Sequence, residues 1–300
     1  MKKVTLFFTT LKHNYVWFLL LTPAFITLVA IVVFPLFFSL SLSFYHWNIV
    51  KIGGRTWAGI SNYADILFHD SYFFSSLKVT LLYLIGTIPT QFGFGLIIAL
   101  LLQNITGKII GFLRTTLIIP TVMTPIVVGI IWRLMYNPDL GTLNYFLTLF
   151  GFSPINWVGL PRTALLSIMI ADIWQWTPFM ALILLAGLQS LPVEPYEAAI
   201  VDGASFWQIF RYITLPLLTP TILVALLIRI IDSFKTFDII FVLTQGGPGR
   251  STETINYYTY RYGFKFFHMG YTSALSWTLL VVVTIISMIL IKLLRSEELY

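Results

Sequence analysis

Apolar residues in this chain form long runs that few charged residues interrupt. Burying a charged side chain in hydrocarbon costs several kcal/mol, so a nearly charge-free run of about 20 residues predicts a membrane-spanning helix. Six such helices are predicted, over residues 16–42, 79–103, 112–135, 163–189, 217–243 and 271–293. We therefore expect an all-α polytopic membrane protein in which residues 1–300 form a single transmembrane domain.

Composition supports a membrane location for most of the chain. Apolar residues make up 58% and charged residues 10% of its 300 residues, whereas soluble domains average about 45–50% and about 25%. So few charges cannot cover a soluble surface, which excludes a soluble enzyme, and no run of Lys and Arg marks a nucleic-acid-binding module. The chain has no cysteine, and its four histidines show no metal-binding spacing, so we expect neither disulfides nor a metal site.

Basic residues leave the orientation in the membrane open. Lys2, Lys3 and Lys12 precede the first span and Lys51 and Arg55 follow it, which favours an N-terminus inside the cell. Over the whole chain, however, eight Lys and Arg residues fall on each side of the membrane. The first apolar run exceeds a signal-peptide core of about 7–15 residues, so we expect it to stay as a helix.

The segment 190–216, between the fourth and fifth spans, predicts a short helix–turn–helix. Pro192 and Pro195 end the preceding helix and suit the start of a new one, whose first turn carries Glu194 and Glu197. Gly203 allows a sharp backbone turn. Large apolar side chains then recur at helical spacing, at Phe206, Trp207, Ile209, Phe210 and Ile213. Such a piece is suited to being held by another protein, or alternatively to covering the inner face of the bundle.

The order and spacing of residues in this segment are specific. The segment contains Glu197-Ala198-Ala199, then Asp202-Gly203-Ala204, then Ile213, Leu215 and Pro216. This pattern resembles the EAA loop of binding-protein-dependent ABC importer permeases. FKTFDIIFVLTQGGPG at 234–249 and WAGISNY at 57–63 are similar to the sugar-uptake (maltose/glycerol-phosphate-type) branch of that family. The resemblance covers nearly the whole chain.

The resemblance implies a type I ABC importer permease fold with a cytoplasmic coupling helix between the fourth and fifth spans. The residues that would couple to the ATPase are Glu197, Ala198, Ala199, Asp202, Gly203 and Phe210. It also implies a cell-membrane location with both termini cytoplasmic. The implied partners are a second permease chain in a heterodimer, two ATPase subunits and an extracytoplasmic substrate-binding protein.

The chain lacks the G-x-x-x-x-G-K-[ST] motif that binds nucleotide phosphates. We therefore expect no catalytic residue and no cofactor in this chain, and no ATP hydrolysis of its own. ATP and Mg²⁺ would be bound by the partner ATPase subunits.

Ionisable residues within the predicted spans suggest a binding site, because charges at membrane depth are costly and usually functional. Asp172 shares a helix face with Gln175 and Trp176, and the fifth span carries four charged residues three apart, beginning with Arg229 and Asp232. Carboxylates, amides and aromatic faces suit sugar hydroxyls and C–H surfaces. The candidate substrate-binding residues are Asp172, Gln175, Trp176, Asp232, Ser233 and Thr236. Alternatively, Arg229, Asp232, Lys235 and Asp238 form self-compensating pairs inside the bundle.

The sequence predicts the membrane-spanning subunit of an ATP-driven importer that translocates a sugar or oligosaccharide delivered by a binding protein. Two alternatives stay open. One is a self-sufficient secondary transporter or channel that uses an intramembrane Asp/Lys relay. The other is a membrane scaffold without transport activity. The sequence does not specify the sugar.

Overall fold

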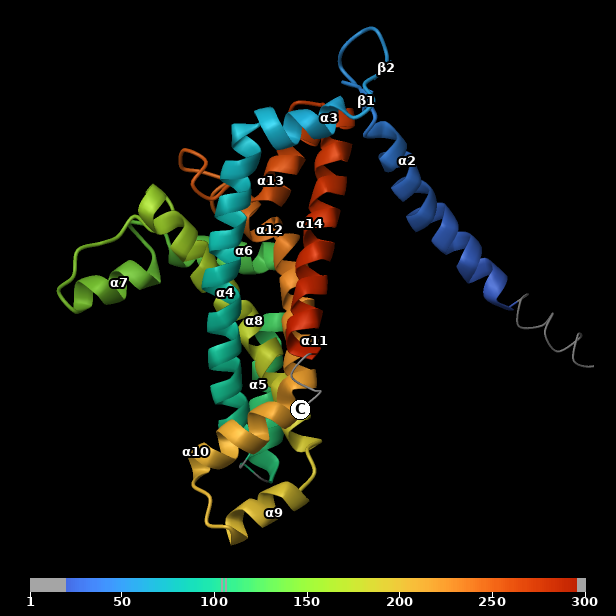
Figure 1. Ribbon diagram of the computed structural model, residues 1–300. Helices are drawn as coiled ribbons and strands as arrows, with labels where there is room; N and C mark the ends of the chain where they lie inside the picture. The colour runs from blue at the N-terminus through green and yellow to red at the C-terminus, as the bar shows by residue number, and fades with distance from the viewer. Residues whose placement is uncertain (1–19, 104, 106, 296–300) are drawn as a thin grey trace, which may run out of the picture. The chain divides into compact units, whose positions relative to one another are not determined.

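The computed structural model describes residues 20–103, 105 and 107–295 (Figure 1). The chain divides into two compact units. The first unit combines the described residues up to His69 with residues 262–278, and the second combines residues 70–261 with the described residues from Leu279 onward. Residues 16–19 of the first predicted span lie outside the described residues, as do both chain ends.

The first unit contains an apolar helical segment, Leu20–Leu42, that is long enough to cross a membrane. This segment includes a π-helical turn, η1 (Val29–Val33), and α2 (Phe34–Leu42). Strand β1 (Tyr45–His46) pairs antiparallel with β2 (Thr56–Trp57), with Tyr45 opposite Trp57. The short helices α3 (Ser61–Ala64) and η2 (Asp65–His69) complete the first stretch of this unit.

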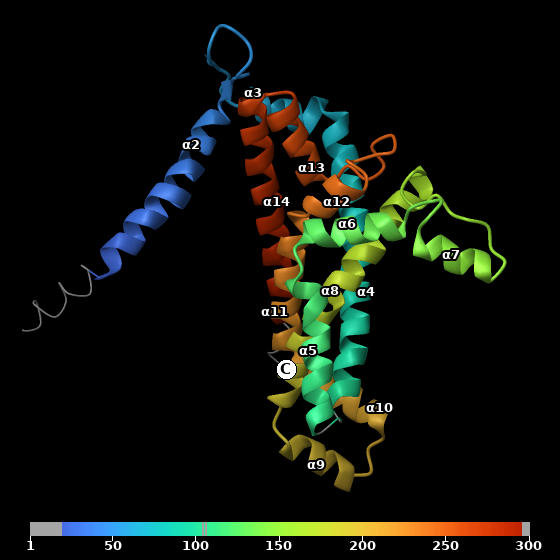
Figure 2. The same ribbon diagram turned by 180° about the vertical axis from the view of Figure 1, so that it is seen from behind.

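The second unit is built around three long helices, α4 (Ser71–Gln103), α8 (Pro161–Gln189) and α11 (Leu215–Phe234). Helices α4 and α8 lie side by side in both views (Figures 1 and 2). A Cβ atom at Gly95 of α4 would lie 2.9 Å from the Met180 Cβ of α8 and 3.1 Å from the Ala181 nitrogen. Small residues allow such close helix packing within a membrane, where van der Waals contact replaces the hydrophobic effect.

The third predicted span, residues 112–135, consists of two helices rather than one. Helix α5 (Lys108–Val122) and α6 (Pro125–Met135) are bent by 92° relative to each other. Met123 and Thr124 between them are extended, and the ring of Pro125 disfavours a helical conformation at Thr124, the residue before it. Within the part of the chain that the structure describes, five helices are long and apolar enough to cross a membrane, and this bent pair makes a sixth if it counts as one span. The prediction of an all-α polytopic membrane fold is confirmed.

The fifth predicted span, residues 217–243, also differs from the structure. Helix α11 ends at Phe234, and a short helix, α12 (Asp238–Leu243), begins after a break. The carbonyl of Lys235 accepts a 2.6 Å hydrogen bond from the Asn256 side chain instead of continuing the helix. Phe237 is non-helical, and its ring packs against Tyr257 and Tyr260 of α13 (Ile255–Tyr260). The polar residues of α11 and Asp238 therefore do not share one continuous helix face.

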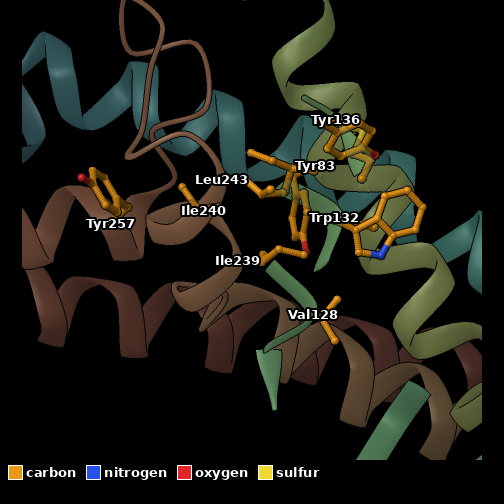
Figure 3. Close-up of a cluster of buried hydrophobic side chains, with 11 residues drawn as sticks. Tyr83, Val128, Trp132, Tyr136, Ile239, Ile240, Leu243 and Tyr257 are labelled. Carbon is orange, nitrogen blue, oxygen red and sulfur yellow. The ribbon is translucent and has the colours of Figure 1, made fainter. Parts of the chain in front are cut away.

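Two apolar clusters lie toward opposite ends of α8 and are separated by polar side chains. One cluster contains Ile168 and Met169 of α8 with residues of α4, α6, α12 and α13 (Figure 3). The other contains Leu184 and Leu188 of α8 with residues of α4 and α11. Asp172 and Gln175 lie in sequence between these clusters and are both buried. The core thus places a polar layer part-way along the helix bundle.

The loop between α12 and α13 is held by ion pairs. Glu253 is almost completely buried and pairs with Arg250 and with Arg261, whose Nη1 lies 2.6 Å from Glu253 Oε1. Thr252 donates a 2.8 Å hydrogen bond to the carbonyl of Gly247. Helix α7 (Thr142–Leu149) lies in the longer connection between α6 and α8. The final helix, α14 (Met269–Arg295), follows the turn η4 (Arg261–Lys265) and contributes to both units.

Candidate functional site

A buried guanidinium joins the three long helices of the second unit. Arg229 of α11, with a side chain only 1% exposed, donates from Nε to Gln91 Oε1 of α4 at 3.0 Å. Its Nη2 lies 3.2 Å from Asp172 Oδ2 of α8, and Gln91 Nε2 donates to the same carboxylate oxygen at 2.7 Å. Each polar group in this triangle has a partner, which offsets the cost of removing charge from water.

Asp232 is the solvent-facing member of this network. Arg229 Nη1 donates to Asp232 Oδ2 at 2.9 Å, but the Asp232 side chain remains 49% exposed, compared with 3% for Asp172. The ring of Trp176 lies beneath the guanidinium, with its centroid 4.5 Å from Arg229 Cζ, which is within the range of a cation–π contact. Arg229 therefore links a buried carboxylate to an accessible one.

These groups border a small cavity of about 100 Å³. Its wall comes from α6, α8, the end of α11, the α11–α12 break and α12. The lining residues are Pro125, Asp172, Gln175, Trp176, Asp232, Lys235, Thr236, Phe237, Asp238 and Ile239. Three carboxylates and one lysine line the cavity, and the Arg229 guanidinium lies behind it. The break in the helix is what turns Thr236 and Phe237 toward this space.

Five of the six predicted substrate-binding residues come together at this cavity, but they do not occupy equivalent positions. Gln175 is buried, and its amide donates a 3.1 Å hydrogen bond to the carbonyl of Met123, at the bend between α5 and α6. Thr236 Oγ1 lies 3.5 Å from the Tyr83 hydroxyl. Ser233 is buried and does not line the cavity, and its hydroxyl has no hydrogen-bond partner among the described residues.

Gln91 was missed by the reasoning from sequence. It is a lone amide within a charge-free run of α4, and its side chain is completely buried. Gln91 contacts Asp172, which lies 81 residues later in the sequence, and Arg229, which lies 138 residues later. A strongly polar side chain is rare inside a predicted span, and this rarity could have marked Gln91 as a residue with a buried polar partner or a function.

The segment between α8 and α11 forms two short helices joined by a defined turn. Helix α9 (Glu194–Val201) is followed by Asp202 and then by Gly203, whose backbone is left-handed with a φ of 76°. The Gly203 amide donates to the Ile200 carbonyl and the Ala204 amide donates to the Ala199 carbonyl, which is the Schellman arrangement of a helix C-terminus. Helix α10 (Phe206–Ile209) begins with a capping box between Ser205 and Gln208. It continues through η3 (Phe210–Thr214) into α11.

This segment presents an accessible surface at one end of the second unit's helix bundle (Figures 1 and 2). None of the α9 side chains is buried within the described structure. Glu197, Ala198, Asp202 and Gly203 are exposed, whereas Ala199 and Phe210 are half-buried. Large apolar side chains are exposed beside them, at Ile200, Val201, Phe206, Trp207 and Tyr212. Exposed apolar patches of this kind mark interaction surfaces.

Among the described residues, no cluster of three or more His, Asp or Glu side chains is arranged to hold a metal ion. The chemistry that the cavity offers is hydrogen bonding and ion pairing next to aromatic rings. Nothing in this arrangement provides a nucleophile with an adjacent base.

Comparison with known proteins connects this geometry to a family of transporters. Residues 7–296 match the family described as binding-protein-dependent transport system inner membrane component. Over 274 residues, the chain is 43% identical to the probable ABC transporter permease protein y4oQ of Sinorhizobium fredii, covering 91% of this chain and 87% of that protein. Over 282 residues, it is 37% identical to the trehalose/maltose transport system permease protein MalF of Thermococcus litoralis, covering 94% of each.

A solved structure shares the fold. A chain in the crystal structure of a bacterial ABC transporter involved in the import of the acidic polysaccharide alginate superposes with a TM-score of 0.82 at 23% identity. The superposition covers 97% of this chain and 98% of that one. The fold is that of a type I ABC importer permease, as the resemblance implied. The matches extend over almost the entire sequence, and the chain belongs to the family of binding-protein-dependent transport system inner membrane components.

Proposed function

We propose that this chain is the membrane-spanning subunit of an ATP-driven importer that translocates a sugar or oligosaccharide delivered by an extracytoplasmic binding protein. A relative that is 37% identical is named as a trehalose/maltose transport permease, which supports a sugar as substrate. The observation that carries the proposal is the polar cavity beside α8 and α11, in a helix bundle that also contains two clusters of buried apolar side chains.

The cavity offers the groups that a sugar requires. Asp232 accepts hydrogen bonds from hydroxyl groups, and Thr236 and Lys235 donate them. Trp176 and Phe237 supply aromatic faces for the C–H side of a sugar ring. We assign direct substrate contact to Asp232, Trp176 and Thr236. We assign Asp172 and Gln175 to holding the wall of the site, because their side chains already have protein partners.

Energy for transport would arrive through the segment α9–α10. We propose that Glu197, Ala198, Ala199, Asp202, Gly203 and Phe210 form the contact with an ATPase subunit, supported by the exposure of α9 and of the aromatic side chains that follow it. ATP and Mg²⁺ would be bound by two such subunits. With this contact, α9–α10 and both chain termini would lie in the cytoplasm, and the binding protein would dock on the opposite side of the membrane.

The remaining partners follow from the same proposal. A second permease chain, in a heterodimer, would complete the pathway, and the two units of this chain would work as one permease domain. Surrounding lipid covers the exposed apolar faces of the helices.

A substrate-stimulated ATPase assay tests the proposal. The chain is copurified with its partner permease, ATPase and binding protein, reconstituted, and screened across a panel of sugars. We expect one sugar class to stimulate ATP hydrolysis, and Asp232→Asn to raise the half-saturating sugar concentration about tenfold, as expected for losing a hydrogen bond to a charged group. Asp139→Asn, which neutralises an exposed carboxylate in the α6–α7 loop, is the matched control.

Two results would contradict the proposal. Uptake driven by an ion gradient in liposomes that contain this chain alone would identify a secondary transporter. Complete absence of sugar stimulation in an assembled, ATP-hydrolysing complex would exclude a sugar as the substrate.

A further inference from the structure

A larger cavity, of about 430 Å³, lies entirely within the first unit. Its volume is in the range of ligand-binding pockets. The hairpin after α2 forms most of its wall, and residues just before and within the start of α14 close it. The lining residues are His46, Trp47, Asn48, Lys51, Ile52, Gly53, Gly54, Thr56, Asn62, His268 and Tyr271.

The cavity has a basic lining. Lys51, His46 and His268 are its basic residues, and none of the described residues that line it is an aspartate or a glutamate. Partial burial and the neighbouring Lys51 ammonium lower the pKa of His268 below its ordinary value, so the imidazole is a neutral N–H donor at pH 7. Asp65 is the acidic residue among those that the structure describes in this unit, and it lies 3.4 Å from His69. Such a site favours an anion.

The cavity lies next to the ends of two apolar helical segments that are long enough to cross a membrane. Leu42 ends the first membrane-spanning segment and Met269 begins the last. Backbone hydrogen bonds from Ile49 to the Phe267 carbonyl, at 3.2 Å, and from Gly270 to the Trp47 carbonyl, at 3.3 Å, hold the two stretches together. Trp and Tyr side chains, here Trp47 and Tyr271 in the cavity wall, prefer the headgroup level of a membrane.

The hairpin tip next to the cavity is apolar and accessible. Ile49, Val50 and Ile52 flank Lys51, and all three are exposed, Ile52 completely. Apolar side chains beside a basic residue suit insertion at the boundary between headgroups and acyl chains. A soluble anion would gain nothing from these side chains, whereas a lipid would cover them.

We propose that this cavity binds the phosphate group of a phospholipid headgroup. Lys51 supplies the compensating charge, and Ile49, Val50 and Ile52 contact the acyl chains. His268 and the Nδ1 nitrogen of His46 supply hydrogen-bond donors, because Nε2 of His46 already lies 3.1 Å from the Ser61 hydroxyl. Asn62 shapes the wall, because both hydrogens of its amide are donated to the backbone carbonyls of Ser43 and Tyr45. With the termini in the cytoplasm, the lipid belongs to the outer leaflet.

Native mass spectrometry of the intact importer complex in detergent tests this site. Phosphatidylglycerol is titrated against the wild-type complex and against Lys51→Gln and Ile52→Ser, two substitutions of exposed side chains that are compatible with folding. We expect Lys51→Gln to reduce lipid retention about fivefold, the effect of one basic residue at an anionic membrane surface. Lys265→Ala, which removes a charge from the same unit outside the cavity, is the control and should retain lipid as the wild type does.

Further measurements distinguish a phospholipid from the other molecules that could occupy the cavity. A galactosyl diacylglycerol with the same acyl chains lacks phosphate and should bind without discrimination between wild type and Lys51→Gln. Inorganic phosphate should displace phosphatidylglycerol only at concentrations far above that of the lipid, and displacement at equal concentration would overturn the lipid assignment in favour of a free-phosphate site. Equal lipid retention in all variants, or loss of binding-protein-stimulated ATPase in Lys51→Gln without loss of lipid, would overturn the proposal.

Discussion

At the scale of single residues, the same residue type takes different roles according to burial. Asp172 and Asp232 both pair with Arg229, yet one carboxylate is buried and the other is half-exposed. Removing one partner of a buried ion pair leaves an uncompensated charge and is costly, whereas an exposed pair contributes little to stability. Substitution of Asp172 and substitution of Asp232 should therefore have different effects on stability.

We predict that Asp172→Asn lowers the free energy of unfolding by about 3 kcal/mol, whereas Asp232→Asn lowers it by less than about 1 kcal/mol. Thermal unfolding of the detergent-purified complex measures both. Asp232→Asn should instead alter the sugar dependence of ATP hydrolysis. Equal destabilisation by the two substitutions would show that the buried network does not depend on Asp172 more than on Asp232.

At the scale of helices, breaks in predicted spans determine which side chains reach the cavity. The bend between α5 and α6 frees the Met123 carbonyl, and the Gln175 amide of α8 satisfies it at 3.1 Å. An unsatisfied carbonyl in a membrane interior is costly because no water replaces the lost bond. Gln175, a predicted substrate-binding residue, therefore satisfies a backbone carbonyl at this bend in the structure.

We predict that Gln175→Ala, which removes this contact, lowers the free energy of unfolding by about 1–3 kcal/mol, the range for an unsatisfied buried polar group. Gln189→Ala, at the exposed end of the same helix, should be nearly neutral. The unfolding midpoints of the two variants give the comparison. A Gln175→Ala variant as stable as Gln189→Ala would mean that the Met123 carbonyl finds another donor.

The turn at Gly203 belongs to the same scale. Its φ of 76° is unfavourable for residues with a Cβ, although a Cβ there would meet no atom within 4 Å, so the cost of an alanine is conformational and about 1–2 kcal/mol. A proline would also lose the hydrogen bond from the Gly203 amide to the Ile200 carbonyl. We predict that Gly203→Ala or Gly203→Pro uncouples sugar binding from ATP hydrolysis while membrane insertion is preserved. Comparison of sugar-stimulated and basal ATPase rates measures this.

Gly151 provides a matched control for that prediction. It follows α7 with a φ of 81°, again with no atom within 4 Å of a Cβ. Gly151→Ala should carry a similar conformational cost without uncoupling. If Gly203→Pro supported full uptake, the angle between α9 and α10 would not matter for coupling.

At the scale of the whole molecule, basic residues do not reveal which side of the membrane each loop faces, because the predicted sides carry equal numbers of Lys and Arg. Some of the basic residues on the side predicted to be outside have structural contacts in the folded chain. Arg250 and Arg261 neutralise the buried Glu253, and Lys51 borders the basic cavity of the first unit. The positive-inside rule depends on an excess of Lys and Arg in the short loops on one side, so an equal count leaves the orientation to be measured.

The absence of cysteine from the sequence makes the orientation directly measurable. We predict that Ser153→Cys, in the exposed loop after α7, reacts with a membrane-impermeant maleimide in intact cells. Tyr212→Cys, in the exposed part of η3, should react only after the cytoplasmic side is opened. The reverse labelling pattern would place α9–α10 outside and exclude contact with a cytoplasmic ATPase.

The sequence alone determined that most of the chain faces lipid, where its spans approximately lie, and that the chain turns at Gly203. These features are local, because hydropathy over about 20 residues decides whether a helix enters lipid, and a glycine after a short helix permits a left-handed C-terminus. Tertiary structure alone decided the partners of Arg229, the buried position of Gln91 and the hydrogen-bond partners of Asp172 and Gln175. Those contacts join helices up to 138 residues apart, and only the packing of α4, α8 and α11 fixes which polar side chains face one another and which face the cavity.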